Sequence, residues 1–133
     1  MVTIVSRYKL NFPSEGGSLK ITGKSPIYDP QEILTSSTSA SPWTRKCRND
    51  VFNLGFDNQD LLELIKIAVG TGIFKGSEWC ESKPGGPWAA CDAYSVSRVE
   101  INEETEKKYQ CYYFVKFCIS DTGSVLLTVS CHV

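Results

Sequence analysis

The most reactive side chains of this sequence are six cysteines and a single histidine. A cysteine thiol becomes an effective nucleophile when a general base lies within hydrogen-bonding reach, and the only imidazole is that of His132, the penultimate residue. If Ser120 pairs with Ser124 in the last hairpin, His132 lies opposite Tyr112 and about 20 Å from Cys118, at 3.3 Å per strand position. The spacing therefore argues against cysteine–histidine catalysis, and we expect a protein that is not an enzyme.

The spacing of the other candidate residues gives no support to metal or phosphate chemistry. Structural zinc sites usually pair ligands two to four residues apart, whereas the closest two cysteines, Cys111 and Cys118, are seven positions apart. Residues 23–25 (Gly-Lys-Ser) match the end of a phosphate-binding loop, but Ser18 replaces the upstream glycine and Pro26 stands where a helix should begin. We expect neither a metal nor any other cofactor.

A group of carboxylates lies at Glu103, Glu104 and Glu106, directly before two lysines. General acid–base chemistry needs carboxylates in a shielded cleft that separates their pKa values. This charged run is instead typical of a solvated turn. Together with Glu100, these side chains could complement a basic cleft on a protein partner.

The stretch from Trp79 to Cys91 places two tryptophans and two cysteines around a Pro-Gly-Gly-Pro turn. Cys80 and Cys91 are the cysteine pair best placed for a disulfide bond. Trp79 and Trp88 are either rigid aromatic anchors on a presented loop or covers over the open edge of the core. Tyr112, on the outer side of the last hairpin, is a further candidate for contact with a partner.

The elements that position these residues are clearest at the C-terminus. Residues 120–123 (Ser-Asp-Thr-Gly) predict a turn between two runs rich in β-branched and aromatic residues. A preceding strand at 93–101 and a turn at 102–105 complete a three-stranded meander. With Ser120 opposite Ser124, one apolar face of the last hairpin should meet the core. Its residues are Cys111, Tyr113, Val115, Phe117, Ile119, Val125, Leu127, Val129, Cys131 and Val133.

A helix is predicted near residues 58–69. Asp57 is a good N-cap, and Asp60 adds negative charge where the helix dipole favours it. Gly70 and Gly72 end the helix. Its apolar residues cover so much of the circumference that the helix should be buried on more than one side.

The remaining segments are less regular. Residues 2–12 and 18–28 predict an N-terminal hairpin, residues 35–42 a flexible connection and residues 50–54 a strand. One main helix packed on an antiparallel sheet makes an α+β fold. We expect a single domain over residues 1–133.

Composition and charge narrow the classes of function. The 133 residues are 22% charged and 41% hydrophobic with a net charge of −1, which favours one soluble domain and neither a nucleic-acid nor a membrane partner. Six cysteines are many for this length, as in exported disulfide-bonded proteins. A core of this size needs no such crosslinks, and Cys118 points away from Cys111 and Cys131. We therefore expect reduced thiols and a cytoplasmic protein, with secretion as the alternative.

These observations predict a non-enzymatic protein that binds and inhibits another protein. An immunity or antitoxin-type protein, which neutralises a cognate toxin or enzyme by direct contact, fits a compact scaffold with acidic and aromatic surfaces. The alternative is a secreted disulfide-containing module, such as a protease inhibitor or a carbohydrate-binding protein, that uses the loop between the two tryptophans. The residues expected to contact the partner are Trp79, Trp88, Glu100, Glu103, Glu104, Glu106 and Tyr112.

Overall fold

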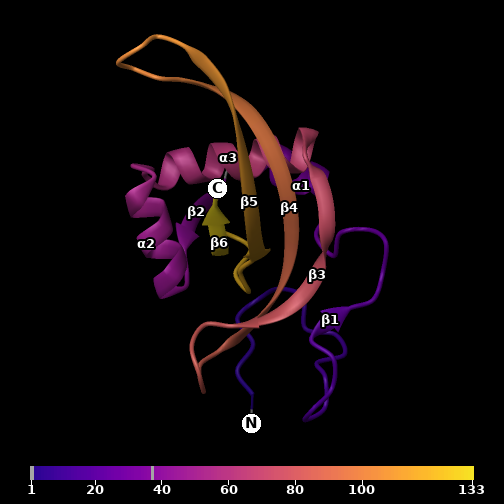
Figure 1. Cartoon of the computed structure of the whole chain (residues 1–133). Coiled ribbons are helices and arrows are strands. Elements are labelled where there is room, and N and C mark those ends of the chain that lie inside the picture. The colour runs from indigo at the N-terminus through magenta and orange to yellow at the C-terminus, as the bar shows by residue number, and fades with distance from the viewer. Residues whose placement is uncertain (1, 37) are drawn as a thin grey trace.

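The computed structural model describes residues 2–36 and 38–133, which form a mixed six-stranded sheet and three helices in one domain (Figure 1). The sheet order is β1-β3-β4-β5-β6-β2, and α3 crosses behind β4 and β5 in Figure 1. The prediction of an α+β domain is confirmed at this level. The strands are β1 (Lys20–Ile21), β2 (Ser39–Pro42), β3 (Ile73–Glu81), β4 (Trp88–Ile101), β5 (Lys108–Ile119) and β6 (Val125–His132). The helices are α1 (Pro30–Thr35), α2 (Arg45–Asn53) and α3 (Asn58–Thr71).

The antiparallel meander at the C-terminus is present, and it is longer than predicted. β3, β4, β5 and β6 pair consecutively and antiparallel. β4 has 14 residues and β5 has 12, against about five or six in an average strand. The two central strands therefore extend beyond their neighbours.

The sheet is mixed because β2 pairs in parallel with β6. The prediction of a flexible connection over 35–42 is wrong, since this segment contains β2. Its run of serine and threonine gives little strand signal. Pairing in a sheet uses backbone groups, and the free edge of β6 supplies them whatever the side chains are.

The predicted strand over residues 50–54 is also wrong, because these residues belong to α2 and the turn after it. Thr44 caps this helix by accepting a hydrogen bond from the Cys47 amide at 3.1 Å. Cys47 and Val51, one turn apart, are buried, while Phe52 is 82% exposed. The short run of apolar residues fits a helix face as well as a strand.

The predicted N-terminal hairpin does not form. β1 has two residues and pairs with β3, with Lys20 opposite Glu78. Residues 5–7 bind instead at the end of the meander where β4 begins and β5 ends. There the Val5 amide donates to the Trp88 carbonyl at 2.9 Å and the Arg7 amide to the Ile119 carbonyl at 2.8 Å.

The helix predicted near residues 58–69 is confirmed as α3. Asp57 and Asp60 form a reciprocal capping box, with distances of 2.8 and 3.0 Å between each carboxylate and the other residue's amide. Gly72 is the C-cap. Five of its side chains are buried, which agrees with burial on more than one side: Leu61, Leu62, Leu64, Ile65 and Ala68.

The register of the last hairpin differs from the predicted one by one residue at the turn. The Ser120 amide donates to the Val125 carbonyl at 2.8 Å, so Ile119 faces Leu126, and Leu126 is buried in the core. A bulge after Lys116 then shifts the pairing, so that Cys131 lies opposite Val115 and remains buried. The same bulge places His132 opposite Phe114 rather than Tyr112.

Among the described residues, the core contains one carboxylate, that of Asp92, which is 0% exposed. It accepts hydrogen bonds from the amides of Ile27 and Tyr28 at 3.1 and 3.0 Å and from the Ser77 hydroxyl at 2.5 Å. Burial raises its pKa above the ordinary value, although these hydrogen bonds oppose the shift. Asp92 thus joins the loop before α1 to β3 and β4.

Candidate protein-binding surface

β4 and β5 continue past the rest of the sheet as a two-stranded ribbon of residues 97–112, which we call the arm. β3 pairs with β4 only as far as Ser95, and β6 pairs with β5 only as far as Phe114. Beyond those positions β4 and β5 pair with each other alone, up to Ile101 opposite Lys108. Figure 1 shows the arm, in orange, projecting past α3. An isolated two-stranded ribbon is marginally stable in water, so the arm needs support from the body.

That support comes from Arg98 at the base of the arm. Its Nε lies 2.5 Å from the Glu100 carboxylate. Its guanidinium lies over the ring of Tyr113 at 5.2 Å and over the ring of Phe56 at 5.4 Å. Phe56 directly precedes the N-cap of α3, so these cation–π contacts connect the arm to the helix layer.

Glu100 is held inside the same network. The Tyr113 hydroxyl donates to its Oε1 at 2.9 Å. Burial alone would raise the pKa of Glu100, but hydrogen bonds from Arg98 and Tyr113 bring it below the ordinary value. Burial and the hydrogen bonds with Cys111 and Glu100 raise the pKa of Tyr113, so the phenol stays a donor. Glu100 therefore positions the arm, and we leave it out of the contact surface.

The tip of the arm has a fixed backbone. The Asn102 side chain accepts hydrogen bonds from the amides of Glu104 and Thr105 at 2.9 and 3.1 Å. The Glu106 amide donates to the Asn102 carbonyl at 2.7 Å, and Glu106 adopts a left-handed φ of 58°. Within the described part of the chain, Glu103, Glu104 and Glu106 are exposed and form no ion pair. The tip thus presents three carboxylates on a defined turn, followed by the two ammonium groups of Lys107 and Lys108, for a net charge of −1.

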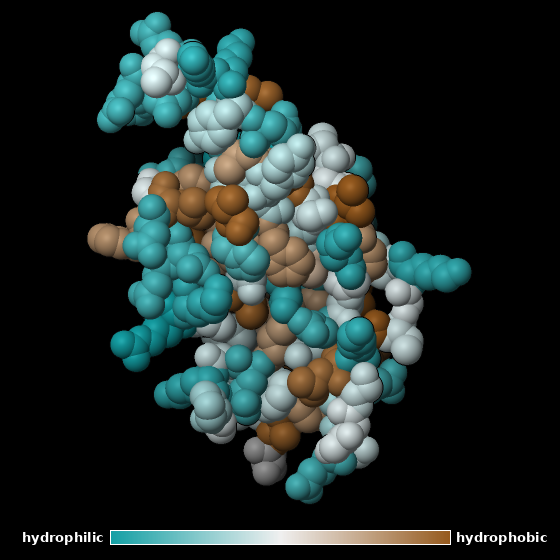
Figure 2. All heavy atoms as spheres, viewed as in Figure 1, coloured by the Kyte–Doolittle hydropathy of each residue, from teal (hydrophilic) through white to brown (hydrophobic). Residues whose placement is uncertain are grey.

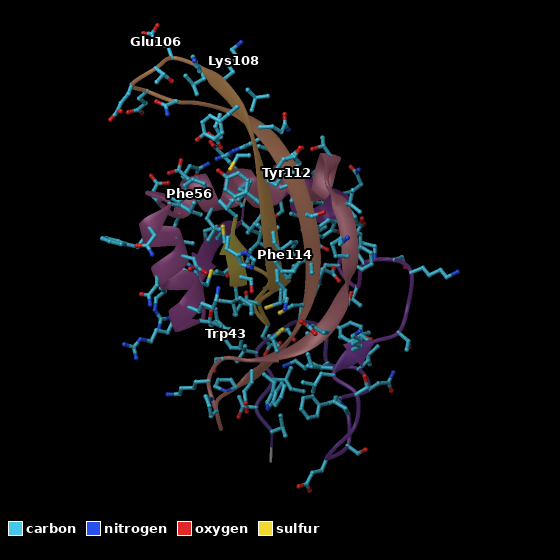
Figure 3. All side chains as sticks on the ribbon, in the orientation of Figure 1. Trp43, Phe56, Glu106, Lys108, Tyr112 and Phe114 are labelled. Atoms are coloured by element: carbon cyan, nitrogen blue, oxygen red, sulfur yellow. The ribbon has the colours of Figure 1, made fainter. Side chains whose placement is uncertain are left out.

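One face of the arm carries exposed apolar side chains among the polar Ser97, Gln110 and Lys108. Pairing of Ser97 with Tyr112, and alternation along β4, put Val99, Ile101 and Tyr112 on the face opposite the helices, which we call the outer face. Their exposed fractions are 58%, 59% and 67%. Figure 2 shows the hydrophilic tip standing clear of the body, with hydrophobic side chains exposed at its neck. Figure 3 shows Glu106 and Lys108 at the end of the arm, with Tyr112 and Phe114 further down β5.

Trp79 and Trp88 lie far from this surface. Trp79 is 2% exposed, and its ring packs against Phe12 at 4.9 Å and Tyr8 at 6.2 Å. Trp88 lies 5.4 Å from the Phe12 ring. Thirteen strand positions separate Trp88 from the end of β4 at Ile101, about 40 Å along the strand. Trp79 closes the core, and neither indole belongs to one site with the arm.

All six cysteines are in the thiol form in this structure. Cys80 and Cys91 are buried on the outer face of β3 and β4 near the β3–β4 turn, and their disulfide bond stays a prediction. Burial raises the pKa of Cys91 well above its ordinary value, and the neighbouring thiols of Cys118 and Cys80 add to the shift. His132 stacks on Phe114, with ring centroids 5.4 Å apart. Within residues 2–36 and 38–133, no three His, Cys, Asp or Glu side chains are grouped so as to hold a metal ion.

Sequence reasoning identified the acidic tip and Tyr112 but missed Arg98, Phe56, Val99 and Ile101. The alternation of Val99 and Ile101 with charged residues was a usable signal for a strand with two different faces. Which face stays open depends on where β3 and β6 end, and that is a property of the assembled sheet.

No family model, curated protein or solved structure matches this chain. None of the helices formed by the described residues has the length and apolar character needed to cross a bilayer.

Proposed function

We propose that this protein is a cytoplasmic, non-enzymatic inhibitor that neutralises a cognate toxin or enzyme by direct binding, with the arm as its binding element. The observation that carries the proposal is a fixed ribbon that projects from the body and exposes both apolar side chains and three unpaired carboxylates. An immunity or antitoxin-type protein needs such a preformed element.

The side chains of the arm supply the two contributions that a tight inhibitor requires. Tyr112, Val99 and Ile101 offer apolar area that is exposed in the free protein, and aromatic residues are prominent among the side chains that dominate binding energies. The carboxylates of the tip favour a basic partner, since complementary charge accelerates encounter and suppresses wrong partners.

The way the arm is held also supports inhibition by direct contact. Binding costs free energy when flexible segments become ordered. The Arg98 contacts at the base and the Asn102 hydrogen bonds at the tip order the arm before any partner arrives. An arm that is ordered before binding therefore gives a higher affinity than a flexible arm that makes the same contacts.

The test is affinity capture from the source organism with matched variants. The wild-type chain should retain one stoichiometric protein and inhibit its activity. The tip variant Glu103→Gln/Glu104→Gln should bind about tenfold more weakly, with a smaller salt dependence, because two steering charges are lost. The control variant Glu15→Gln/Glu63→Gln removes two exposed carboxylates outside the arm and should bind like the wild type.

Two results would overturn the proposal. One is a captured partner that binds both double variants with equal affinity, because the arm would then not be the binding element. The other is binding to a glycan array with no protein recovered, which would support the carbohydrate-binding alternative.

A further inference from the structure

A pocket of about 250 Å³ opens on the outer face at the foot of the arm, among β1, β3, β4 and β5. Lys20, Lys75 and Lys116 line it together with one carboxylate, Glu78. Phe114 and Ala93 supply apolar wall. The pocket therefore combines an apolar lining with three lysine side chains.

The charges in this pocket do not cancel. Lys116 forms an ion pair with Glu78 and has a side chain only 16% exposed. Burial disfavours its charged form, but the hydrogen bond that Lys116 donates to Glu78 and the charges of neighbouring groups raise the pKa of Lys116 above the ordinary value. Among the residues that the structure describes, Lys20 and Lys75 form no ion pair. Three lysines against one glutamate give the lining residues a net charge of +2, which favours an anionic ligand.

The size of the pocket limits the ligand to a small group. Small-molecule and cofactor sites typically measure about 300–1,000 Å³, and this pocket is below that range. Part of its space comes from Gly76, which follows a bulge in β3 and has a φ of 121°. A Cβ on Gly76 would meet no atom within 4 Å, so the absent side chain leaves open space. A single side chain fits this volume better than a cofactor does.

The pocket and the tip share the outer face of the same two strands. Nine strand positions separate Ala93, in the pocket wall, from Asn102 at the tip, about 30 Å along β4. A standard protein interface covers about 800 Å² on each partner, a patch roughly as wide as this distance. One partner can therefore contact the tip, the outer face of the arm and the pocket together.

We infer that this pocket receives an acidic side chain of the same partner that the arm binds. The inference rests on the proposed function. The partner would present a basic region to the tip, apolar groups to Val99, Ile101 and Tyr112, and a carboxylate to Lys20 and Lys75. Opposite charges at the two ends of the surface would fix the orientation of the partner, because the reversed orientation places like charges together.

The first test needs no partner. N-acetyl-glutamate methylamide and its neutral counterpart N-acetyl-glutamine methylamide are titrated into the ¹⁵N-labelled protein, and amide shifts are followed at Gly76, Ser77 and Ala93. The glutamate probe should shift these amides and the glutamine probe should not. The variant Lys20→Met/Lys75→Met should weaken the glutamate probe at least about tenfold. The control Lys24→Met/Lys83→Met, in exposed loops, should leave its affinity unchanged.

Several outcomes of this titration would overturn the inference. They are the absence of localised shifts with the glutamate probe, equal shifts with both probes, and equal weakening by both lysine variants. Inorganic phosphate binding more tightly than the glutamate probe would also overturn it, since the pocket would then be a site for a free oxyanion.

The second test uses the partner and separates this inference from the proposed function. If the pocket variant Lys20→Met/Lys75→Met binds the partner about tenfold more weakly, as the tip variant does, the inference is supported. If the tip variant binds weakly while the pocket variant binds normally, the inference fails and the proposed function stands. If neither variant changes the affinity, both fail.

Discussion

Replacement of Arg98 by methionine tests whether the contacts at the base of the arm hold the arm in place. The substitution removes two cation–π contacts, of about 0.5–1 kcal/mol each at partly exposed sites. It also removes the ion pair with Glu100, which is worth about 0.5 kcal/mol because both side chains are partly exposed. The exposed fractions are 24% for Arg98 and 26% for Glu100. Methionine keeps part of the apolar packing over Phe56 and Tyr113. We therefore expect the free energy of arm opening to fall by about 1.5–2 kcal/mol.

Native-state hydrogen exchange measures this quantity directly. Because about 1.4 kcal/mol corresponds to a factor of ten, the amides that pair β4 with β5 between residues 97 and 112 should exchange about 10–30 times faster in the variant. Amides of α3 and of the β5–β6 pairing should change much less, since local opening does not require global unfolding. The control variant Lys107→Met changes an exposed residue of the arm that forms no ion pair among the described residues. It should leave hydrogen exchange at the base of the arm unchanged.

Two exchange patterns would refute this reasoning. Unchanged exchange in the arm would mean that Arg98 does not restrain it. An equal acceleration in the arm and in α3 would mean that the substitution destabilises the whole domain. If the expected pattern is found, Arg98→Met should also weaken partner binding, because the free energy needed to order the arm then reduces the free energy of association.

Further predictions concern Asp92, the cap of α3 and the cysteines. Asp92→Asn should lower the free energy of unfolding by about 2–4 kcal/mol in urea denaturation, because an amide has one acceptor oxygen and leaves a buried donor unsatisfied. Burial raises the folded pKa of Asp92 above the ordinary 3.8, so the folded state binds the proton more tightly than the unfolded chain. Relative to Asp92→Asn, the wild type should therefore lose stability as the pH rises from about 3.8 through the folded pKa. Asp57→Ala should cost about 1 kcal/mol, or a few degrees in Tm by calorimetry, because it removes the cap of α3. Thiol titration should count six thiols in denaturant, and in the native state Cys111 should react first because the other five are buried.

The outcomes that would contradict these predictions are distinct. A wild-type advantage over Asp92→Asn that grows from pH 4 to pH 7 would mean that the folded protein prefers the ionised carboxylate. An unchanged Tm for Asp57→Ala would mean that the cap of α3 contributes nothing measurable. Fewer than six thiols in denaturant would favour a disulfide-bonded, secreted protein over the cytoplasmic one proposed above.

Part of the candidate surface was predictable from the sequence. Three glutamates within four residues at a turn mark an exposed tip, and the placement of Tyr112 on the outer side of the last hairpin holds in the structure. Trp79 and Glu100 could not be judged in this way. The exposure of the Trp79 indole depends on Phe12 and Tyr8, which are distant in the chain. The exposure of the Glu100 carboxylate depends on Arg98 nearby and on Tyr113 in the next strand, which only the strand pairing brings to it.

The sequence alone determined the elements whose signals are local. The capping box of α3 and the turns of the C-terminal meander lie within a few residues of the structure they specify, so they can be recognised without tertiary information. The tertiary structure decided the parallel pairing of β2 with β6, the binding of the N-terminal segment to the end of the meander, and the bulge that resets the last hairpin. These features depend on backbone groups left unpaired after the other strands associate. Backbone groups are the same at nearly every residue, so no side-chain pattern specifies which of them will meet.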